Sequence, residues 1–184
     1  MKYTASTAIR SILVTSLILL ASPLAWAIQP SLTEIRAEAD GTYTYEYSIK
    51  IDDTIRVEGR TVEPSPDFFT IFNFTGMVPG SEKQPKGWTF STSQNGVTPF
   101  RGGRAVVSPL DIPGIPNLTW SRTGATIDGP AEISGFSVRT KIKESMVGEY
   151  GSQVTRTKAG TLKPMSEMEF KEARTGAVTT PKLN

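Results

Sequence analysis

The sequence has no cysteine and no histidine among its 184 residues. Without these side chains the protein cannot build a serine–histidine–aspartate or cysteine–histidine nucleophile system. It also cannot form a histidine- or thiolate-based site for zinc, copper, haem or an iron–sulfur cluster. Disulfides and a thioether-linked lipid anchor are excluded in the same way. Most hydrolase and oxidoreductase classes therefore do not apply, and we expect a protein that is not an enzyme and carries no cofactor.

Long apolar runs are absent except for one short segment near the N-terminus. Lys2 and Arg10 come before the apolar run 12–20, Pro23 ends it, and residues 25–27 (Ala-Trp-Ala) offer the small-x-small pattern that signal peptidase accepts. The run is shorter than the roughly 20 residues that a membrane-spanning helix needs. We therefore predict that residues 1–27 are a cleaved signal peptide. The mature protein is then periplasmic or extracellular, without a stable membrane span.

An excess of either charge is absent from the rest of the chain. The sequence has 20 basic and 18 acidic residues, and because Lys2 and Arg10 belong to the predicted signal, 18 of each remain. The mature chain therefore has no basic stripe of the kind that binds nucleic acid or an anionic membrane. We expect neither of these partners, and a component of the cell surface or matrix stays open.

Apolar residues at every second position dominate the mature chain. Residues 42–51 place three tyrosines and two isoleucines on one face, which is typical of a half-buried strand. Asp52 and Asp53 then lead into a second alternating run at residues 55–58, which predicts a hairpin. Residues 68–74 carry aromatic side chains on both faces, which predicts a strand at the centre of the core.

Further short runs with strand character are separated by glycine- and proline-containing turns, at residues 87–92, 105–107, 117–121, 135–143, 150–157 and 168–170. Eight or nine short strands predict an all-β fold, namely an antiparallel β-sandwich of immunoglobulin-like or jelly-roll-like type. The expected organisation after the signal is an N-terminal lead-in, one sandwich domain and a flexible tail, at residues 28–41, 42–172 and 173–184.

Residues 166–174 fit two structures. Ser166 and Glu169 form a capping box, and Met165 with Phe170 has the spacing of a hydrophobic staple, which indicates a short helix. Apolar and charged residues also alternate in the same stretch, which indicates an edge strand. We favour the strand because a sandwich usually ends its chain within a sheet.

Acidic residues near turns are the candidate metal ligands. Asp52 and Asp53, together with Asp40 or Asp111, could offer carboxylate oxygens to calcium. Calcium needs six to eight oxygen ligands, and the sequence has no acidic loop of the EF-hand kind. Turn formation between two strands explains two adjacent aspartates equally well, so both interpretations stay open.

Aromatic residues are the candidate binding residues. Tyr45, Trp88 and Trp120 could form a platform on which a sugar or a peptide stacks. In a small sandwich, however, burial in the core already explains such aromatics. Asn73 and Asn117 each begin a glycosylation sequon, but both lie in predicted strands, so we interpret the sequons as coincidence.

The aromatic and turn residues also form a set of short motifs: residues 67–74 (DFFTIFNF), 79–81 (PGS), 87–91 (GWTFS) and 117–120 (NLTW). These motifs resemble uncharacterised exported bacterial proteins, many of which end in a PEP-CTERM sorting tail. The similarity covers roughly residues 42–161 and implies a shared β-sandwich, with no catalytic residues. The sorting tail itself is missing here, so we do not expect surface anchoring by that route.

Two functional classes remain. We favour an exported, non-enzymatic structural or binding module of unknown ligand, whose signature would be an exposed apolar patch or an open sheet edge. The alternative is a small carboxylate-dependent carbohydrate enzyme, which needs two carboxyl groups about 5 to 10 Å apart in a concave site. The acids on or beside predicted strands are Glu46, Glu58, Asp67 and Glu132.

Overall fold

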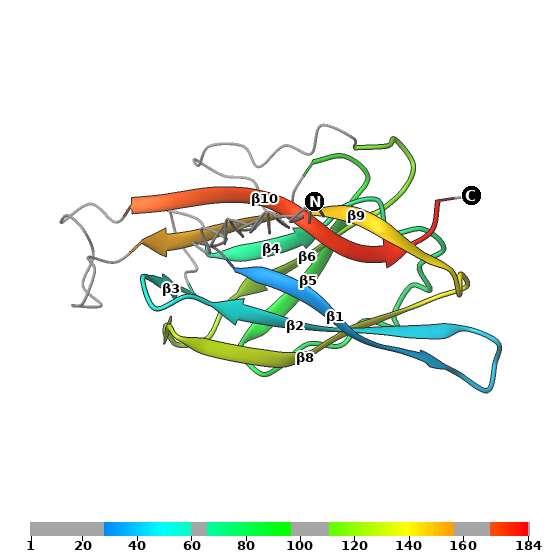
Figure 1. The fold of residues 1–184 in the computed structure, drawn as a ribbon, viewed down its shortest axis with the longest axis horizontal. Coiled ribbons are helices and arrows are strands. Elements are labelled where there is room, and N and C mark those ends of the chain that lie inside the picture. Colours follow the sequence, from blue (N-terminus) through cyan, green and yellow to red (C-terminus); the bar gives the residue numbers. More distant parts are fainter. Residues whose placement is uncertain (1–27, 60–65, 97–110, 157–169, 184) are drawn as a thin grey trace, which may run out of the picture.

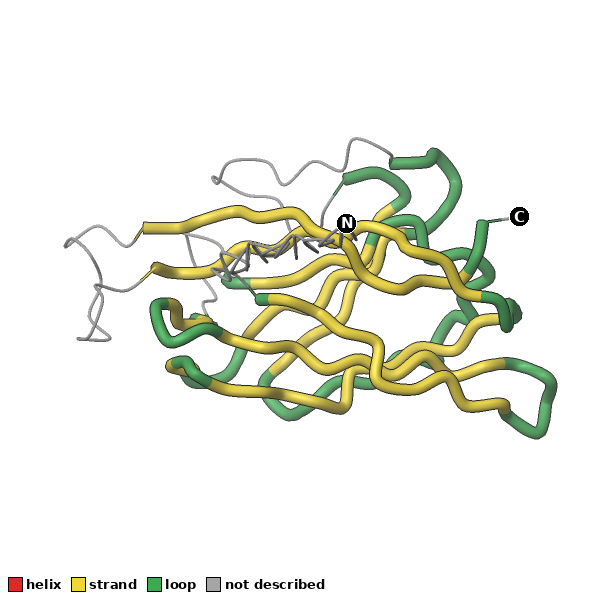
Figure 2. Tube along the Cα trace, viewed as in Figure 1, coloured by secondary structure: helices red, strands yellow, loops and turns green. Residues whose placement is uncertain are grey.

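The computed structural model describes residues 28–59, 66–96, 111–156 and 170–183. Within these ranges the chain forms ten strands in two antiparallel sheets and no helix, and one of the sheets is curled like half of a barrel. Figure 2 shows that strands make up most of the two layers and that the loops gather at their ends. The expected all-β, antiparallel class is therefore confirmed.

The smaller sheet has the order β1-β2-β8, with β1 (Gln29–Ala37), β2 (Tyr43–Ile51) and β8 (Ala131–Thr140). The larger sheet has the order β5-β6-β4-β9-β3-β7, and β10 pairs with β9 (Figure 1). Its strands are β3 (Ile55–Val57), β4 (Phe68–Ile71), β5 (Trp88–Ser93), β6 (Asn117–Arg122), β7 (Ile127–Asp128), β9 (Ser145–Arg156) and β10 (Phe170–Pro181).

Strand β9 organises the larger sheet. Residues 150–153 of β9 pair with β4, and residues 155–156 pair with β3, so β4 and β3 follow each other along one edge of β9. The whole of β10 pairs along the opposite edge, in a continuous antiparallel register from Phe170 to Pro181. The β9–β10 ribbon therefore extends beyond the end of β4, where the free edge of β9 pairs with no other strand among the described residues.

The core lies between the two sheets and is rich in aromatic rings. Tyr45 and Tyr47 of β2 are fully buried, as the alternating pattern predicts. Phe69 of β4 stacks on Trp120 with ring centroids 5.1 Å apart, and it meets Phe136 of the smaller sheet edge-on at 5.1 Å. These contacts join the sheets, and such aromatic pairs add to the free energy of burial.

Residues 68–74 are buried on both faces, as the sequence predicts. Phe69 and Phe74 belong to the main core, whereas Phe68 and Phe72 form a second cluster with Ala173 of β10. Only residues 68–71 are strand, because Asn73 takes a left-handed conformation with φ of 53° and redirects the chain. Strands expected at residues 87–92, 117–121, 135–143 and 150–157 are confirmed, with ends shifted by up to five residues, and residue 157 lies outside the described residues.

The expected hairpin between β2 and β3 is wrong. Strand β2 pairs with β1 and β8, whereas β3 pairs with β7 and β9 in the other sheet. A tight two-residue hairpin needs at least one central residue with φ above zero, and neither Asp52 nor Asp53 has a positive φ. Asp52 instead accepts hydrogen bonds from the backbone and hydroxyl of Thr54, both at 3.0 Å. This turn carries the chain from one sheet to the other.

The lead-in at residues 28–41 and the tail at residues 173–184 are corrected as well. Most of the lead-in is β1, whose pairing with β2 shifts register between Leu32 and Glu34, so the bulge hides the period-two pattern. Most of the tail belongs to β10, which is built largely from small residues and lacks a strong apolar alternation. Residues 170–174 are strand, as we favoured over a helix. The signal (residues 1–27), the strand at 105–107 and residues 166–169 lie outside the described residues.

Candidate functional site

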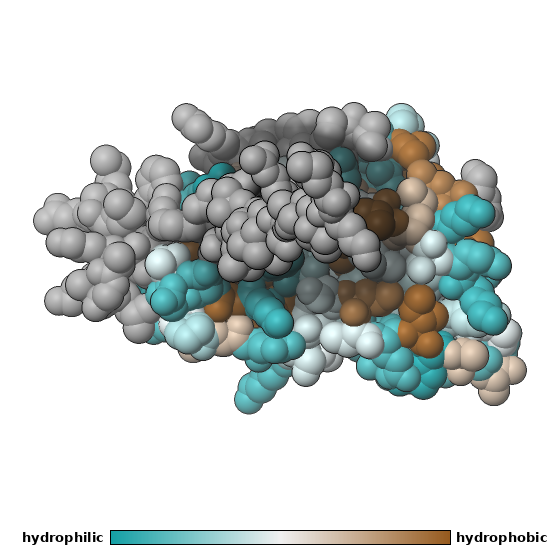
Figure 3. Space-filling model, in the orientation of Figure 1, coloured by the Kyte–Doolittle hydropathy of each residue, from teal (hydrophilic) through white to brown (hydrophobic). Residues whose placement is uncertain are grey.

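A groove of about 790 Å³ lies where the β9–β10 ribbon extends beyond β4. The backbone of Phe72, just after β4, donates a hydrogen bond to the carbonyl of Glu149 at 3.0 Å and closes the sheet at this point. We call this feature the apolar groove, and its lining residues are Phe72, Asn73, 111–113, 146–149, 175–177, Thr180 and Leu183. Figure 3 shows apolar surface, in brown, at this end of the molecule.

Two exposed aliphatic side chains lie in the apolar groove. Val147 is 72% exposed and Ile112 is 36% exposed, and they are the exposed large hydrophobic residues within the described ranges. Both line the same groove although one comes from β9 and the other from the loop before β6. Single exposed apolar residues are ordinary on a protein surface, but two that converge on one hollow indicate a binding surface.

Two glycines of the β9–β10 ribbon leave no room for a side chain. A Cβ atom at Gly176 would lie 2.6 Å from the ring of Tyr150, and one at Gly148 would lie 2.5 Å from the hydroxyl of Thr180. Gly176 pairs directly with Tyr150 across the two strands, so the tyrosine ring fills the space that a side chain would need. The ribbon is therefore closely packed here while the groove stays open.

A network of side-chain amides holds the wall at residues 111–113. Asn117 is fully buried, and its Nδ2 donates to the carboxylate of Asp111 and to the carbonyl of Gly96, both at 2.9 Å. Its Oδ1 accepts from the backbone of Asn73 at 2.8 Å, and Oδ1 of Asn73 accepts from the backbone of Ile112 at 2.8 Å. Both sequon asparagines are therefore engaged in structural hydrogen bonds.

Two acidic side chains lie in the described lining of the groove. Asp111 and Glu149 are the charged residues in its lining as far as the structure describes it, and neither lysine nor arginine is among them. A backbone amide, that of Gly96, and the side chain of Asn117 donate to Asp111, so its two hydrogen-bond partners are neutral. The groove therefore combines apolar walls with acidic groups, in a volume typical of small-molecule sites.

A second group of interest is a buried ionic cluster at the other end of β9. The ammonium of Lys171 on β10 lies 2.9 Å from Asp67 and 3.6 Å from Glu58. Asp67 is fully buried and also accepts hydrogen bonds from the backbone of Glu58 at 2.8 Å and from Thr155 at 2.9 Å. Burial raises the pKa of Asp67 to about 6, although Lys171 and these hydrogen bonds act in the opposite direction.

This cluster bears on the carbohydrate-enzyme alternative, because Glu58 and Asp67 are two of the four acids expected beside strands. Both carboxylates face the same ammonium, and each oxygen of Asp67 already has a protein partner. A general acid or a nucleophile needs access to substrate. The arrangement favours a structural role, in which Lys171 ties β10 to residues 58 and 67.

The other two acids are surface groups on the smaller sheet. Glu46 lies 2.8 Å from Arg36, and Glu132 accepts a hydrogen bond from Ser48 at 3.2 Å. Nearby, a polar hollow of about 330 Å³ is lined by residues that include Arg36, Arg139 and Glu82. Arg139 pairs with Asp40 at 2.7 Å, so positive and negative groups compensate each other there.

The candidate calcium ligands are not brought together. Asp52 accepts from Thr54 within its own turn, and a hydrogen bond with Asp52 raises the pKa of Asp53. Asp40 pairs with Thr42 and Arg139, and Asp111 belongs to the groove wall. Within the described ranges, no group of three or more acidic residues is close enough to hold a metal ion.

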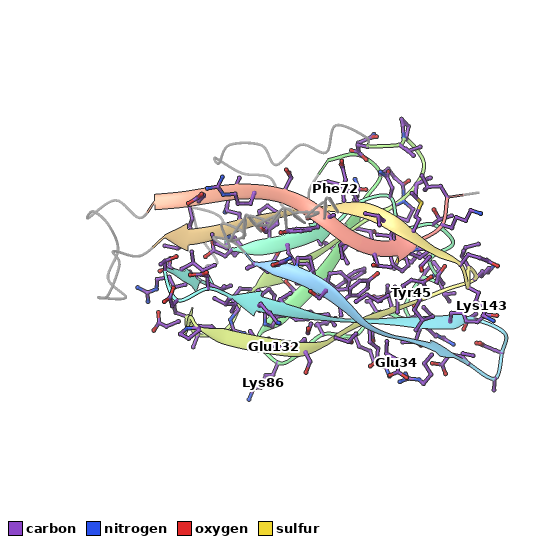
Figure 4. The ribbon with its side chains drawn as sticks, viewed as in Figure 1. Glu34, Tyr45, Phe72, Lys86, Glu132 and Lys143 are labelled. Carbon is purple, nitrogen blue, oxygen red and sulfur yellow. The ribbon has the colours of Figure 1, made fainter. Side chains whose placement is uncertain are left out.

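The three aromatic candidates lie in the core, which corrects the idea of an exposed stacking platform. Tyr45 and Trp120 are fully buried and Trp88 is 4% exposed. The hydroxyl of Tyr45 donates to the carbonyls of Lys143 and Glu144 at 3.2 Å, and Figure 4 shows Tyr45 between the sheets near Lys143. The ring of Trp88 meets Phe136 edge-on at 5.0 Å. None of the three rings is therefore exposed for stacking on a ligand, and the buried indole nitrogens of Trp88 and Trp120 have no hydrogen-bond partner among the described residues.

Among the residues that line the apolar groove, the sequence singled out Asp111 as a candidate calcium ligand and Asn73 as part of a sequon, and neither as part of a groove. Phe72 was assigned to the core, and Ile112 and Val147 carried no signal, because their exposure depends on where β4 ends and on how the loop at residues 111–113 is held. The general expectation of an exposed apolar patch was the only available indication.

Comparison with known proteins assigns no family. No protein-family model matches the chain, and neither a curated protein nor a solved structure does. The resemblance of the aromatic and turn motifs to exported bacterial proteins therefore stays a prediction. In the part of the chain that the structure describes, no helix has the length and apolar character needed to cross a membrane.

Proposed function

We propose that the protein is an exported, non-enzymatic binding module whose binding site is the apolar groove. The observation that carries this proposal is the convergence of Val147 and Ile112, the exposed large aliphatic residues of the described ranges, on one groove of about 790 Å³. Exposed apolar surface costs solubility unless a ligand covers it, and apolar hollows of this size are typical of small-molecule sites.

Binding is tested with a neutral fluorescent probe, N-phenyl-1-naphthylamine, whose emission rises in apolar surroundings. The wild-type protein should bind it, and Val147→Ser should weaken binding about fivefold, because part of the apolar contact is lost. The matched control is Ala37→Ser, at an exposed position at the end of β1. Equal binding by all three proteins, each with an unchanged unfolding midpoint, would exclude the groove as the site.

Export is the second part of the proposal. It is supported by the basic start, the apolar run and the small-x-small motif of residues 1–27. The test is fractionation of the native host followed by intact-mass measurement. We expect the periplasmic or extracellular protein to begin at Ile28, whereas a cytoplasmic protein that retains residues 1–27 would contradict export.

The finer fold assignment also belongs to this proposal. We assign the two sheets to the β-sandwich class, of immunoglobulin-like or jelly-roll-like type, which suits an exported binding module. Support comes from the core that the sheets share, in which Phe69 of one sheet contacts Phe136 of the other. An experimental structure whose sheets do not share this core would contradict the assignment.

A further inference from the structure

We infer that the side chains of Lys171 and Asp67 form an amide bond in the folded protein, with Glu58 as the group that transfers the protons. The site is the buried ionic cluster, at the end of β9 opposite the apolar groove. The inference therefore goes beyond the proposed binding function and does not depend on it. It rests on the placement, the burial and the hydrogen bonds of these side chains.

The amine and the carboxyl group are already in contact. Nζ of Lys171 on β10 lies 2.9 Å from Oδ1 of Asp67, although the two residues are 104 positions apart in the sequence. Thr155 on β9 holds both groups, because its hydroxyl accepts from Nζ at 2.6 Å and donates to Oδ2 of Asp67 at 2.9 Å. Well-oriented groups within one molecule can have effective concentrations of about 10⁵ M or more, which favours their condensation.

Burial favours the uncharged forms that react. The side chain of Asp67 is fully buried, and those of Glu58 and Lys171 are 7% and 12% exposed. A buried ammonium and carboxylate have lost much of their hydration, so transfer of one proton from nitrogen to oxygen costs less than it does in water. The same loss of hydration raises the pKa of Asp67 to about 6. The transfer gives a carboxylic acid and a neutral amine, which is the nucleophile.

The two oxygens of Asp67 have different surroundings. Oδ2 accepts hydrogen bonds from the backbone of Glu58 at 2.8 Å and from the hydroxyl of Thr155, whereas Oδ1 faces the ammonium. Two fixed donors stabilise the negative charge that develops on Oδ2 when the nitrogen attacks the carboxyl carbon, as in an oxyanion hole. Oδ1 is then the oxygen that leaves.

Glu58 is placed to move the protons. Its Oε2 lies 3.6 Å from Nζ of Lys171, and its Oε1 lies 3.3 Å from Nε of Arg56. Glu58 accepts a proton from the attacking nitrogen and gives it to the leaving oxygen, as a general base and then a general acid. The N–C bond forms and the C–O bond to Oδ1 breaks. One ammonium and one carboxylate thus become one amide and one water, without any other reactant.

The amide joins β10 covalently to the segment before β4. Exported proteins often obtain a cross-link from a disulfide, which this chain cannot form because it has no cysteine. A cross-link over 104 positions restricts the unfolded chain and should raise the midpoint of thermal unfolding by about 10 °C. The carboxyl group of Asp67 titrates only before the bond forms, so the pH dependence of the ionic cluster belongs to the freshly folded protein.

The test is intact-mass measurement of the mature protein after refolding from denaturant and incubation at pH 7. We expect the mass to fall by about 18 Da, the mass of one water, below the value calculated from the sequence. Tandem mass spectrometry of a protease digest should then identify a branched peptide in which residues 67 and 171 are linked. Folded protein that keeps its full mass after prolonged incubation would overturn the inference.

Two lysine variants separate bond formation from folding. Lys171→Arg keeps a cation in the cluster but has no amine, so the folded variant should keep its full mass. The matched control is Lys182→Arg just after β10, which should still lose about 18 Da. A loss of water that persists in Lys171→Arg would place the bond elsewhere and overturn the inference.

Two further variants test the chemistry. Glu58→Gln should slow the loss of water about tenfold or more, and an unchanged rate would overturn the role of Glu58. Asp67→Asn should release ammonia in place of water, a loss of about 17 Da, and should reach the same final mass as the wild type because the product is the same amide. Different final masses of these two proteins would show that residue 67 does not supply the carbonyl of the bond, and would overturn the inference.

Discussion

The amide of Asn117 donates a hydrogen bond to the carboxylate of Asp111, with 2.9 Å between Nδ2 and Oδ1. The same amide also binds the carbonyl of Gly96 and the backbone of Asn73. One fully buried side chain thus joins the end of β4, the loop after β5 and the loop before β6. Three of the hydrogen bonds that hold the wall of the apolar groove therefore come from this one side chain.

Replacement of this residue should loosen the wall. Asn117→Ala removes three hydrogen bonds and leaves buried polar groups without partners, which we expect to cost about 3 kcal/mol of the free energy of unfolding. The control is Asn95→Ala, at an exposed position in the loop after β5, which should change stability by less than about 0.5 kcal/mol. Urea denaturation measures both values. Equal stability of the two variants would show that the network does not hold the groove.

The close approach of Gly176 and Tyr150 gives a second prediction. Replacing a glycine in a strand by alanine usually raises the free energy of unfolding by about 0.5 to 1 kcal/mol. Gly176→Ala should nevertheless destabilise the protein by about 1 to 3 kcal/mol, because its Cβ atom would lie 2.6 Å from the tyrosine ring. Thermal or urea unfolding shows the sign of the change directly.

The cause of that loss can be separated from other effects with a double-mutant cycle. In a Tyr150→Leu background the ring is gone, so Gly176→Ala should cost little or should stabilise the protein. We expect a coupling free energy of about 1 kcal/mol or more between the two positions. Additive effects would mean that the tyrosine ring is not what excludes a side chain at position 176.

The pattern of residues predicts only part of this architecture. The tyrosine row of β2 and the two-sided aromatic face at residues 68–74 were found because large side chains mark burial clearly. The part of β10 after residue 174 was not predicted because its residues are small, and β1 was not predicted because a bulge interrupts its alternation. Local pattern therefore identifies strands with large apolar side chains and misses those that are held mainly by backbone pairing.

The groove and the ionic cluster could not be predicted from the sequence for another reason. Asp67 and Lys171 are 104 residues apart, and no local signal connects them. Val147 and Ile112 likewise lie far apart in the sequence and line one groove, and a hydrogen bond from the backbone of Ile112 to Asn73, just after β4, positions one of them. Such sites arise where a strand ends beside a longer one, which depends on tertiary pairing and not on the character of single residues.

The buried ionic cluster predicts a specific pH dependence. The pKa of Asp67 is about 6 in the folded protein, against an ordinary value of 3.8. The folded state therefore holds this proton more tightly than the unfolded chain does. The contribution of Asp67 to stability is complete below about pH 4 and is lost as the pH rises through about 6. The difference amounts to about 3 kcal/mol.

Asp67→Asn isolates this contribution, because asparagine does not titrate. The stability of the wild type relative to the variant should fall between pH 4 and pH 7, as measured by urea denaturation at several pH values. Other groups titrate in both proteins and largely cancel in the difference. A constant difference across this range would mean that the pKa of Asp67 is not raised.

Removing the ammonium of Lys171 should lower the stability of the protein more than deprotonation of Asp67 does. Lys171→Met leaves the buried carboxylate of Asp67 without its ammonium partner, and such a change typically costs about 3 to 5 kcal/mol. The cost should be largest above pH 6, where Asp67 is ionised, and smaller near pH 4, where it can hold a proton. Lys182→Met, at an exposed position just after β10, is the matched control and should have little effect at either pH. If the two lysine variants unfold at the same denaturant concentration at pH 7, Lys171 does not fasten β10 to the rest of the sheet.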